Sequence, residues 1–159
     1  MPELIEVHDA AKVRVFGPPA VLDGLTAPVD IVLGRVAPDE LVLLGRPGTG
    51  TELVAGFETA LAGHGARALV VDHTDGWSCF SLVGDDVAEV FARVTQIPFP
   101  DTTADPVFLM GRICDVAGKA FVREGRVDIL TGAEASAHVH HRLEDALGRV
   151  GRREAAVLR

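Results

Sequence analysis

The chain has 159 residues, of which 48% are apolar and 24% are charged, and its formal net charge is −8. These values are typical of a folded globular protein and exclude a disordered chain. The negative charge disfavours binding to nucleic acid or to an anionic membrane, and no apolar run approaches the roughly 20 residues that span a bilayer. Two cysteines make no disulfide framework and the N-terminus carries acids where a signal peptide carries bases, so we expect a cytoplasmic protein.

Hydrophobic periodicity and turn residues predict secondary structure along the chain. In the first half we expect strands at 12–16, 31–36, 41–44 and 67–71, with helices at 20–25 and from residue 50. In the second half we expect strands at 77–83, 107–113, 119–122 and 127–130, with helices at 87–95 and 134–149. The Thr49-x-x-Glu52 pattern predicts a capping box, and Asp86 is expected to cap the helix that follows it.

The two halves repeat one order of elements: strand, helix, strand, strand, helix. Gly17, Gly34 and Gly45 of the first half correspond to Gly84, Gly111 and Gly132 of the second. The offset between them grows along the chain, which places insertions in the loops of the second half. The fold class predicted is α+β, with two ferredoxin-like split β-α-β units in one domain, residues 1–159. The pseudo-repeats span about 10–70 and 71–150, followed by a short basic C-terminal tail.

Two helices are expected to bury an apolar stripe. The stripe of the helix from residue 50 is Leu53, Phe57, Ala60 and Leu61, and that of the last helix is Val139, Leu143, Ala146, Leu147 and Val150.

The glycine-rich segment 45–51 lies between a strand and a helix, where a phosphate loop would lie. A phosphate loop needs a lysine after its last glycine, and Thr51 and Glu52 stand there instead. A capped helix start is the simpler interpretation.

Other polar groupings have ordinary structural explanations beside their chemical ones. His138 and His141 share a helix face with Asp145, but an i, i+3 pair is a weak metal signal and, with His140, fits a solvated face. The segment 72–75 (Asp-His-Thr-Asp) offers acid–base groups without a nucleophile motif, and turn formation explains it. Cys79 and Cys114 are expected to be small core or strand-edge residues.

Two features allow either a structural or a docking role. Trp77 either anchors the core or lies at a subunit interface, where aromatic residues are enriched. Arginines crowd the C-terminal end, as a solvated helix end or as a docking segment for an acidic partner subunit. They are Arg142, Arg149, Arg152, Arg153 and Arg159.

Residues 71–87, with Asp72 and Gly84, resemble a signature of the folate-dependent aminomethyltransferase-like fold. That family includes the glycine-cleavage T-protein, the folate-binding proteins of iron–sulfur assembly and the gamma subunit of heterotetrameric sarcosine oxidase. Residues 37–45 resemble the corresponding stretch of the gamma subunit, whose layout is the most similar. The resemblance covers about residues 10–150 and implies a fold like the N-terminal domain of an aminomethyltransferase.

The resemblance to the gamma subunit implies a subunit without catalytic or metal-binding residues of its own. FAD or FMN and tetrahydrofolate are expected on flavoprotein alpha and beta subunits of a sarcosine (N-methyl amine) oxidase. Aminomethyltransferases carry an acid that works on folate, and the matching segment 117–121 has none. The lysine–glycine–cysteine signature of the iron–sulfur branch is also missing, and the chain has no room for the transferase's second domain.

The expected contacts with partner subunits are Trp77, the proline loop Pro98, Phe99 and Pro100, and the arginines Arg149, Arg152 and Arg153. Two alternatives remain: a stand-alone tetrahydrofolate-binding or aminomethyltransferase-like protein, and a self-associating scaffold with exposed strand edges.

Overall fold

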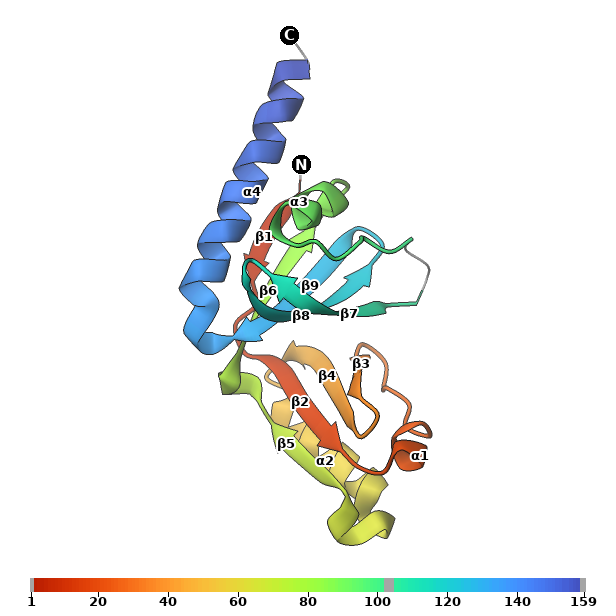
Figure 1. Ribbon diagram of the computed structural model, residues 1–159. Helices are drawn as coiled ribbons and strands as arrows, with labels where there is room; N and C mark the ends of the chain where they lie inside the picture. The colour runs from red at the N-terminus through yellow and green to blue at the C-terminus, as the bar shows by residue number, and fades with distance from the viewer. Residues whose placement is uncertain (1, 102–104, 158–159) are drawn as a thin grey trace. The chain divides into compact units, whose positions relative to one another are not determined.

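The computed structural model describes residues 2–101 and 105–157, with side chains for all of these except residues 65–66 and 152–157. The described residues form a mixed α/β structure with two antiparallel sheets and four α-helices (Figure 1). The chain divides into two compact units. We call His8–Trp77 the inserted unit, and Met1–Val7 together with Ser78–Arg159 the discontinuous unit.

The inserted unit contains one four-stranded sheet in the order β3-β4-β2-β5. Its elements are β2 (Ala10–Phe16), α1 (Pro19–Leu22), β3 (Val32–Ala37), β4 (Glu40–Pro47), α2 (Gly50–Leu61), η1 (Ala62–Arg67), β5 (Leu69–Asp72) and η2 (Thr74–Gly76). The expected hairpin is confirmed, because Ala37 of β3 pairs with Glu40 of β4 across the Pro38-Asp39 turn. The core of this unit is aliphatic apart from Phe57 of α2, which packs with residues such as Val13 and Leu43.

The discontinuous unit contains a five-stranded sheet in the order β1-β6-β9-β8-β7. Its elements are β1 (Glu3–Glu6), β6 (Trp77–Val83), α3 (Val87–Val94), β7 (Val107–Ile113), β8 (Val116–Arg123), β9 (Arg126–Gly132), η3 (Ala133–Ala135) and α4 (Ser136–Val157). Helices α3 and α4 pack against each other and against β9. Phe80 and Phe91 are fully buried in the resulting core.

The two sheets have a common feature. In each, the strand before the first helix (β2 or β6) lies between the strand before the second helix (β4 or β9) and one further strand (β5 or β1). The further strand is the last strand of the inserted unit in one case and the first strand of the chain in the other.

Strand β1 was not predicted from the sequence. This strand has only four residues and pairs in antiparallel register with β6, from Glu3 opposite Val83 to Glu6 opposite Phe80. Two acids flank Leu4 and Ile5, so the segment has too few apolar residues for a periodic pattern. Its partner strand, distant in sequence, determines its conformation.

Neither predicted helix cap forms. The Thr49 hydroxyl donates to the carbonyl oxygen of Arg46 at 2.8 Å, so it bonds backward into the turn and not to the helix. The Thr49 backbone has φ −98° and ψ 8°, outside the extended region typical of a capping residue. Asp86 immediately precedes α3, at the capping position, but its side chain makes no capping hydrogen bond.

The helical stripes are largely confirmed. Leu53, Phe57 and Leu61 of α2 are buried, whereas Ala60 is exposed because it borders a groove described below. On α4, Leu147 is partly buried and the other four predicted residues are buried. Helix α4 continues to Val157, beyond the predicted end at residue 149. Within the described chain, none of the helices combines the length and apolarity needed to cross a membrane.

Candidate functional site

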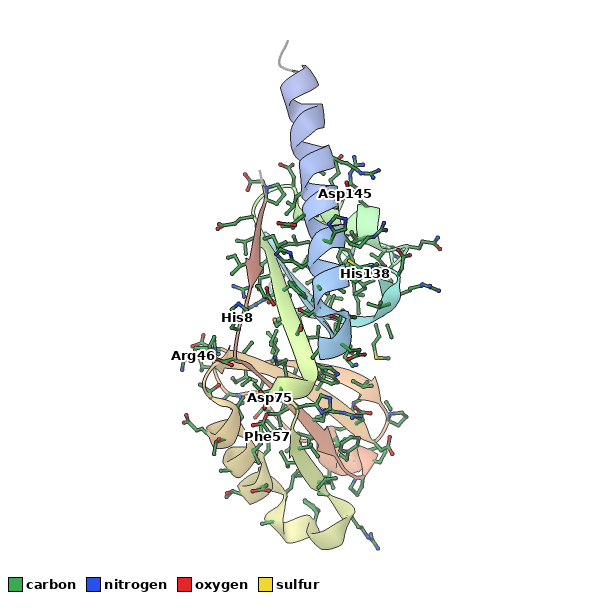
Figure 2. The ribbon with its side chains drawn as sticks, turned by 90° about the vertical axis from the view of Figure 1, so that its left-hand side faces the viewer. His8, Arg46, Phe57, Asp75, His138 and Asp145 are labelled. Atoms are coloured by element: carbon green, nitrogen blue, oxygen red, sulfur yellow. The ribbon has the colours of Figure 1, made fainter. Side chains whose placement is uncertain are left out.

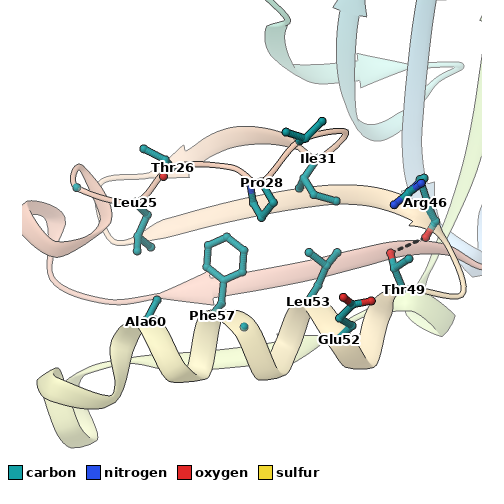
Figure 3. A pocket seen from close by; sticks show the side chains of 13 residues that line it. Leu25, Thr26, Pro28, Ile31, Arg46, Thr49, Glu52, Leu53, Phe57 and Ala60 are labelled. Carbon is teal, nitrogen blue, oxygen red and sulfur yellow. Dashed lines mark hydrogen bonds between the residues drawn. The ribbon is translucent and has the colours of Figure 1, made fainter.

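The inserted unit contains a groove of about 630 Å³ between α2 and residues 24–31, the segment that follows α1 (Figure 3). Leu53 and Phe57 of α2 form its floor and are only 7% and 5% exposed. Leu25, Pro28 and Ile31 face them from the opposite wall. A volume of this size is within the range of natural small-molecule and side-chain pockets.

The groove exists because α1 is a single turn. Pro19 starts this helix, which ends at Leu22 and is followed by Asp23 as its C-cap. Residues 25–31 then pass over α2 without forming a helix of their own. On the α2 side, Gly56 has no side chain, and a Cβ atom added there would meet no atom within 4 Å. The missing helix and the missing side chain together leave the floor uncovered.

Polar groups lie at one end of the groove. Arg46, Thr49 and Glu52 line it there, and Arg46 lies 4.0 Å from Asp30. The side chains of Arg46 and Asp30 are 71% and 60% exposed, so this ion pair is well solvated and weak. Glu52 is in the first turn of α2, where the helix dipole favours an acid. The arrangement suits an apolar group inserted below a hydrated, charged rim.

The residues that line this groove in the described structure include no histidine, cysteine or lysine. Thr49 is committed to the Arg46 carbonyl. Binding of an apolar group is therefore the chemistry that the groove supports best.

The predicted acid–base segment 72–75 is a hydrogen-bonded turn. Hydrogen bonds from the Thr74 hydroxyl and from the Thr74 backbone N–H (2.9 Å) lower the pKa of Asp72 below its ordinary value of 3.8, and the nearby charges of Lys12 and His73 act in the same direction. Burial opposes this shift. Asp75 is exposed (Figure 2). The lowered pKa makes Asp72 a poorer base, which supports the turn interpretation.

Trp77 lies within a cluster of the inserted unit. Its ring contacts the ring of His73 edge-on, with centroids 4.4 Å apart, and the guanidinium of Arg14 lies 5.8 Å from its centroid. The buried Lys12 donates from Nζ to the Trp77 carbonyl oxygen. Trp77 is half-buried, so part of its surface stays accessible.

The other predicted contact residues lie in the discontinuous unit. Phe99 packs against the core, edge-on to Phe91 with ring centroids 5.9 Å apart, whereas Pro98 is exposed and Pro100 half-buried. Arg149 pairs with Asp145 at 2.8 Å. The side chains of Arg152 and Arg153 lie outside the described residues.

Two of the three histidines of α4, His138 and His140, have separate partners. His138 Nε2 lies 2.8 Å from the carbonyl oxygen of Cys114, and His140 Nδ1 lies 3.6 Å from a Glu144 carboxylate oxygen. His138 and Asp145 are labelled along the helix in Figure 2. Among the described side chains no three histidine, cysteine or acidic groups gather as metal ligands would.

Both cysteines are buried, as predicted, with 2% and 0% exposure for Cys79 and Cys114. Burial raises the pKa of the Cys114 thiol to about 11, against an opposing effect of the Arg142 charge. The thiolate is therefore scarce at neutral pH, and a nucleophilic role is disfavoured.

Sequence reasoning missed a buried ionic cluster between β6 and β9. Asp128 is fully buried and accepts hydrogen bonds from Ser81, Arg123 and Arg126. The hydrogen bond from Arg126 Nε (2.9 Å) is the main reason that the pKa of Arg126 is raised. The signal available was an acid in an apolar strand pattern, with an arginine two residues before it.

No family model matches the chain, and no curated protein matches it in sequence. Solved structures do match. A chain of heterotetrameric sarcosine oxidase from Corynebacterium sp. U-96, in complex with pyrrole 2-carboxylate, has 19% identity and a TM-score of 0.76, with 93% of this chain and 84% of that chain covered.

The glycine cleavage system aminomethyltransferase T from Bartonella henselae has 16% identity and a TM-score of 0.61. The match covers 89% of this chain but only 45% of the transferase. The ligand-free regulatory subunit of aspartate kinase from Thermus thermophilus has 16% identity and a TM-score of 0.53, with 91% and 97% covered. At these identities the likeness establishes a shared fold, and that fold is found in both kinds of protein that the sequence resembles.

Proposed function

We propose that this chain is an accessory, gamma-type subunit of a heteromeric, flavin-dependent oxidase that acts on sarcosine or a similar N-methyl amine. The observation that carries the proposal is the fold shared with a chain of heterotetrameric sarcosine oxidase across 93% of this protein and 84% of that chain. In this role the chain contributes binding surface and stability to the complex, which is expected in the cytoplasm.

The reaction would take place on flavoprotein alpha and beta subunits. These subunits would bind FAD or FMN, which accepts the hydride, and tetrahydrofolate, which captures the released one-carbon unit. The segment 117–121, where the family resemblance places the folate-binding acid, lies in β8 and holds Lys119 but no carboxylate. The residues present do not fit a folate site of the transferase type.

We also propose that each unit is a ferredoxin-like split β-α-β arrangement, and that the two units act together as one domain. The sheet order supports this for the inserted unit, where β2 and β4 are adjacent and β3 and β5 lie outside them. In the discontinuous unit β1 takes the outer position next to β6.

The groove of the inserted unit is the contact that we propose for an apolar side chain of a partner subunit. Its floor is apolar, its rim is charged and hydrated, and a subunit interface typically has an apolar centre and a polar rim. A leucine at position 56 would project into the open space beside the floor.

The test is co-expression with candidate flavoprotein subunits of an amine oxidase, followed by size-exclusion chromatography with light scattering. We expect a stable complex containing the unaltered chain. Gly56→Leu should weaken its assembly by about tenfold or more, the loss of one well-buried apolar contact. Gly63→Leu, at another position with open space but outside the groove, is the matched control. A chain that stays alone with every flavoprotein partner contradicts the subunit role.

A second candidate is a stand-alone tetrahydrofolate-binding protein, which the fold shared with aminomethyltransferase T favours. Calorimetric titration of the isolated chain with tetrahydrofolate distinguishes the two functions. Binding that Asp72→Ala or Asp75→Ala weakens would replace our proposal, whereas the accessory role predicts no heat of binding.

A further inference from the structure

A second hollow, of about 790 Å³, lies in the discontinuous unit and is bordered by arginines. It lies between the end of α3, the β7–β8 turn and α4, and Arg93, Arg112 and Arg142 line it. A smaller hollow that shares Arg93 and Arg142 continues along α4 to Arg149. We call these two hollows the arginine groove. Among the residues that the structure describes, its four arginines outnumber by one the acids that pair with them, on a chain whose net charge is −8.

The arginines are only partly neutralised by the protein. Arg93 pairs with Glu89, Arg142 with Asp115 and Arg149 with Asp145, at 2.8, 3.2 and 2.8 Å. Arg112 is exposed and has no ion pair among the described residues. The Nε atom of Arg142 is buried and lacks a hydrogen-bond acceptor in the described structure. A guanidinium has five N–H donors, so each arginine retains donors for a further carboxylate.

A strained turn fixes this arrangement. Cys114 and Asp115 join β7 to β8 with φ of 51° and 67°, although neither is a glycine. Two-residue hairpin turns of this hand usually contain Asn, Asp or Gly, so Asp115 suits its place, but a left-handed conformation costs a residue such as Cys114 about 1–2 kcal/mol. The Cys114 N–H donates to the Val94 carbonyl oxygen at 2.7 Å, and His138 bonds to the Cys114 carbonyl oxygen. Both neighbouring helices therefore hold the turn in place.

The consequence of the turn is the position of two arginines. Asp115, the second residue of the turn, pairs with Arg142 of α4. Arg112 lies just before the turn, where Thr95 Oγ1 donates to its carbonyl oxygen at 2.7 Å. Strained backbone is retained where the surrounding structure enforces it, and it concentrates at functional sites. Here it holds Arg112 and Arg142 at the wall of one groove.

We propose that the arginine groove binds an acidic segment of a partner polypeptide, whose carboxylates contact Arg112 and Arg142. The exposed Pro98 borders the same groove and offers an apolar contact beside the charges. The proposal deepens the accessory-subunit role and rests on it for the identity of the partner. The binding chemistry itself is a property of this chain alone.

The test uses the full chain and a fluorescein-labelled oligo-glutamate peptide, with oligo-glutamine of the same length as a neutral control. Fluorescence anisotropy should detect binding of the glutamate peptide, weakening as salt is raised. Arg112→Gln and Arg142→Gln should each weaken binding about tenfold, the cost of one charge-assisted hydrogen bond. Arg67→Gln makes the same charge change in the inserted unit and should have no effect. Because Arg142→Gln also removes the pair with Asp115, circular dichroism must first show that this variant is folded. Arg112 has no ion pair to lose among the described residues, so Arg112→Gln tests the proposal without this control.

Three outcomes would overturn the proposal. The first is an equal effect of Arg67→Gln, which would indicate only general attraction. The second is displacement of the peptide by free glutarate or inorganic phosphate, at an anion concentration equal to that of the peptide's carboxylates. That result would indicate a small-anion site. The third is a dimer, seen by light scattering, that Arg112→Gln dissociates, because the occupant would then be a second copy of the chain. If the chain binds the peptide but forms no complex with a flavoprotein, this inference holds and the oxidase role fails. If the chain forms a flavoprotein complex that Arg112→Gln leaves intact, the oxidase role holds and this inference fails.

Discussion

The two units have similar sheets, but the helices that pack on these sheets differ greatly. In the discontinuous unit, α3 and α4 pack against each other over the sheet and bury two phenylalanines completely, Phe80 and Phe91. In the inserted unit, α2 packs on the sheet but α1 has only four residues, so the floor at Leu53 and Phe57 opens into a groove. A shortened helix can therefore open part of a core into a groove without disrupting the sheet beneath it.

Among the described residues, each unit buries one charged residue, Asp128 or Lys12, but two of their ion pairs differ strongly in exposure. The discontinuous unit buries Asp128 completely among two arginines and a serine. In the inserted unit the pair of Arg35 and Asp23 is exposed, with Asp23 67% accessible. Removing one partner of the buried cluster leaves the other charges uncompensated and is strongly destabilising. The exposed pair of Arg35 and Asp23 contributes little to stability.

The largest effect is therefore expected for Asp128→Ala. It leaves two guanidinium groups and the Ser81 hydroxyl without their shared acceptor, and should lower the free energy of unfolding by about 3–5 kcal/mol. Urea denaturation measures the change. Asp128→Asn, which keeps part of the hydrogen bonding, should cost less and serves if the alanine variant does not fold. Asp23→Ala in the inserted unit should cost less than about 1 kcal/mol. Equal costs at the two sites would break the contrast in charge burial.

Truncating a phenylalanine in each unit tests whether the core of the discontinuous unit is closed and the groove of the inserted unit is open. Phe91→Ala should cost about 3–5 kcal/mol, because it leaves an enclosed cavity in the core. Phe57→Ala should cost about 2 kcal/mol, because the space it vacates joins the groove and fills with water. Both values come from urea denaturation. A Phe57→Ala cost as large as that of Phe91→Ala would mean that the groove floor behaves as a closed core.

Much of the fold could be predicted from the sequence because local patterns control it. The alternation in β6 (Trp77–Val83) and the apolar run of β7 (Val107–Ile113) gave their exact bounds. The missing parts depend on contacts distant in the sequence. Strand β1 (Glu3–Glu6) is defined by its pairing with β6, and no local pattern can supply that partner.

The candidate site was less predictable for the same reason. The groove arises because α1 stops after Leu22, a length that the predicted helix at 20–25 did not capture. Its walls come from separate segments, and the apolar residues of these segments are predicted from the sequence only to be buried in the core. The arginine groove likewise joins Arg93, Arg112 and Arg142 from three elements, whereas the sequence showed only the arginines crowded near the C-terminus.

Gly56→Ala offers a smaller change of opposite sign. Alanine is favoured over glycine in a helix by about 1 kcal/mol, and the added Cβ meets no atom, so the free energy of unfolding should rise by about that amount. Gly45→Ala is the contrasting variant, since its Cβ would lie 2.7 Å from Leu53 Cδ1 and the protein should lose stability. Thermal unfolding gives both signs. A destabilised Gly56→Ala protein would show that the groove closes over this position.

The smallest expected effect concerns Asp72. Thr74→Val removes the hydroxyl that lowers the pKa of this carboxyl, so the pKa should rise toward 3.8, as a carboxyl-carbon NMR titration can measure. Because the folded pKa is depressed, the stabilising contribution of Asp72 is present above about pH 3.8 and is lost as the pH falls through the lower folded value. Thr59→Val, on the exposed face of α2, should leave the titration unchanged. An unshifted Asp72 in Thr74→Val would contradict the assignment.

The pairing of β1 with β6 has a consequence for biosynthesis. The ribosome makes residues 3–6 before the inserted unit, but their partner residues 80–83 appear only after the whole inserted unit has been made. The inserted unit can fold while translation continues, since its sheet is formed within residues 8–77. Until β6 emerges, the leading segment stays unpaired and accessible to chaperones or to a nascent neighbour.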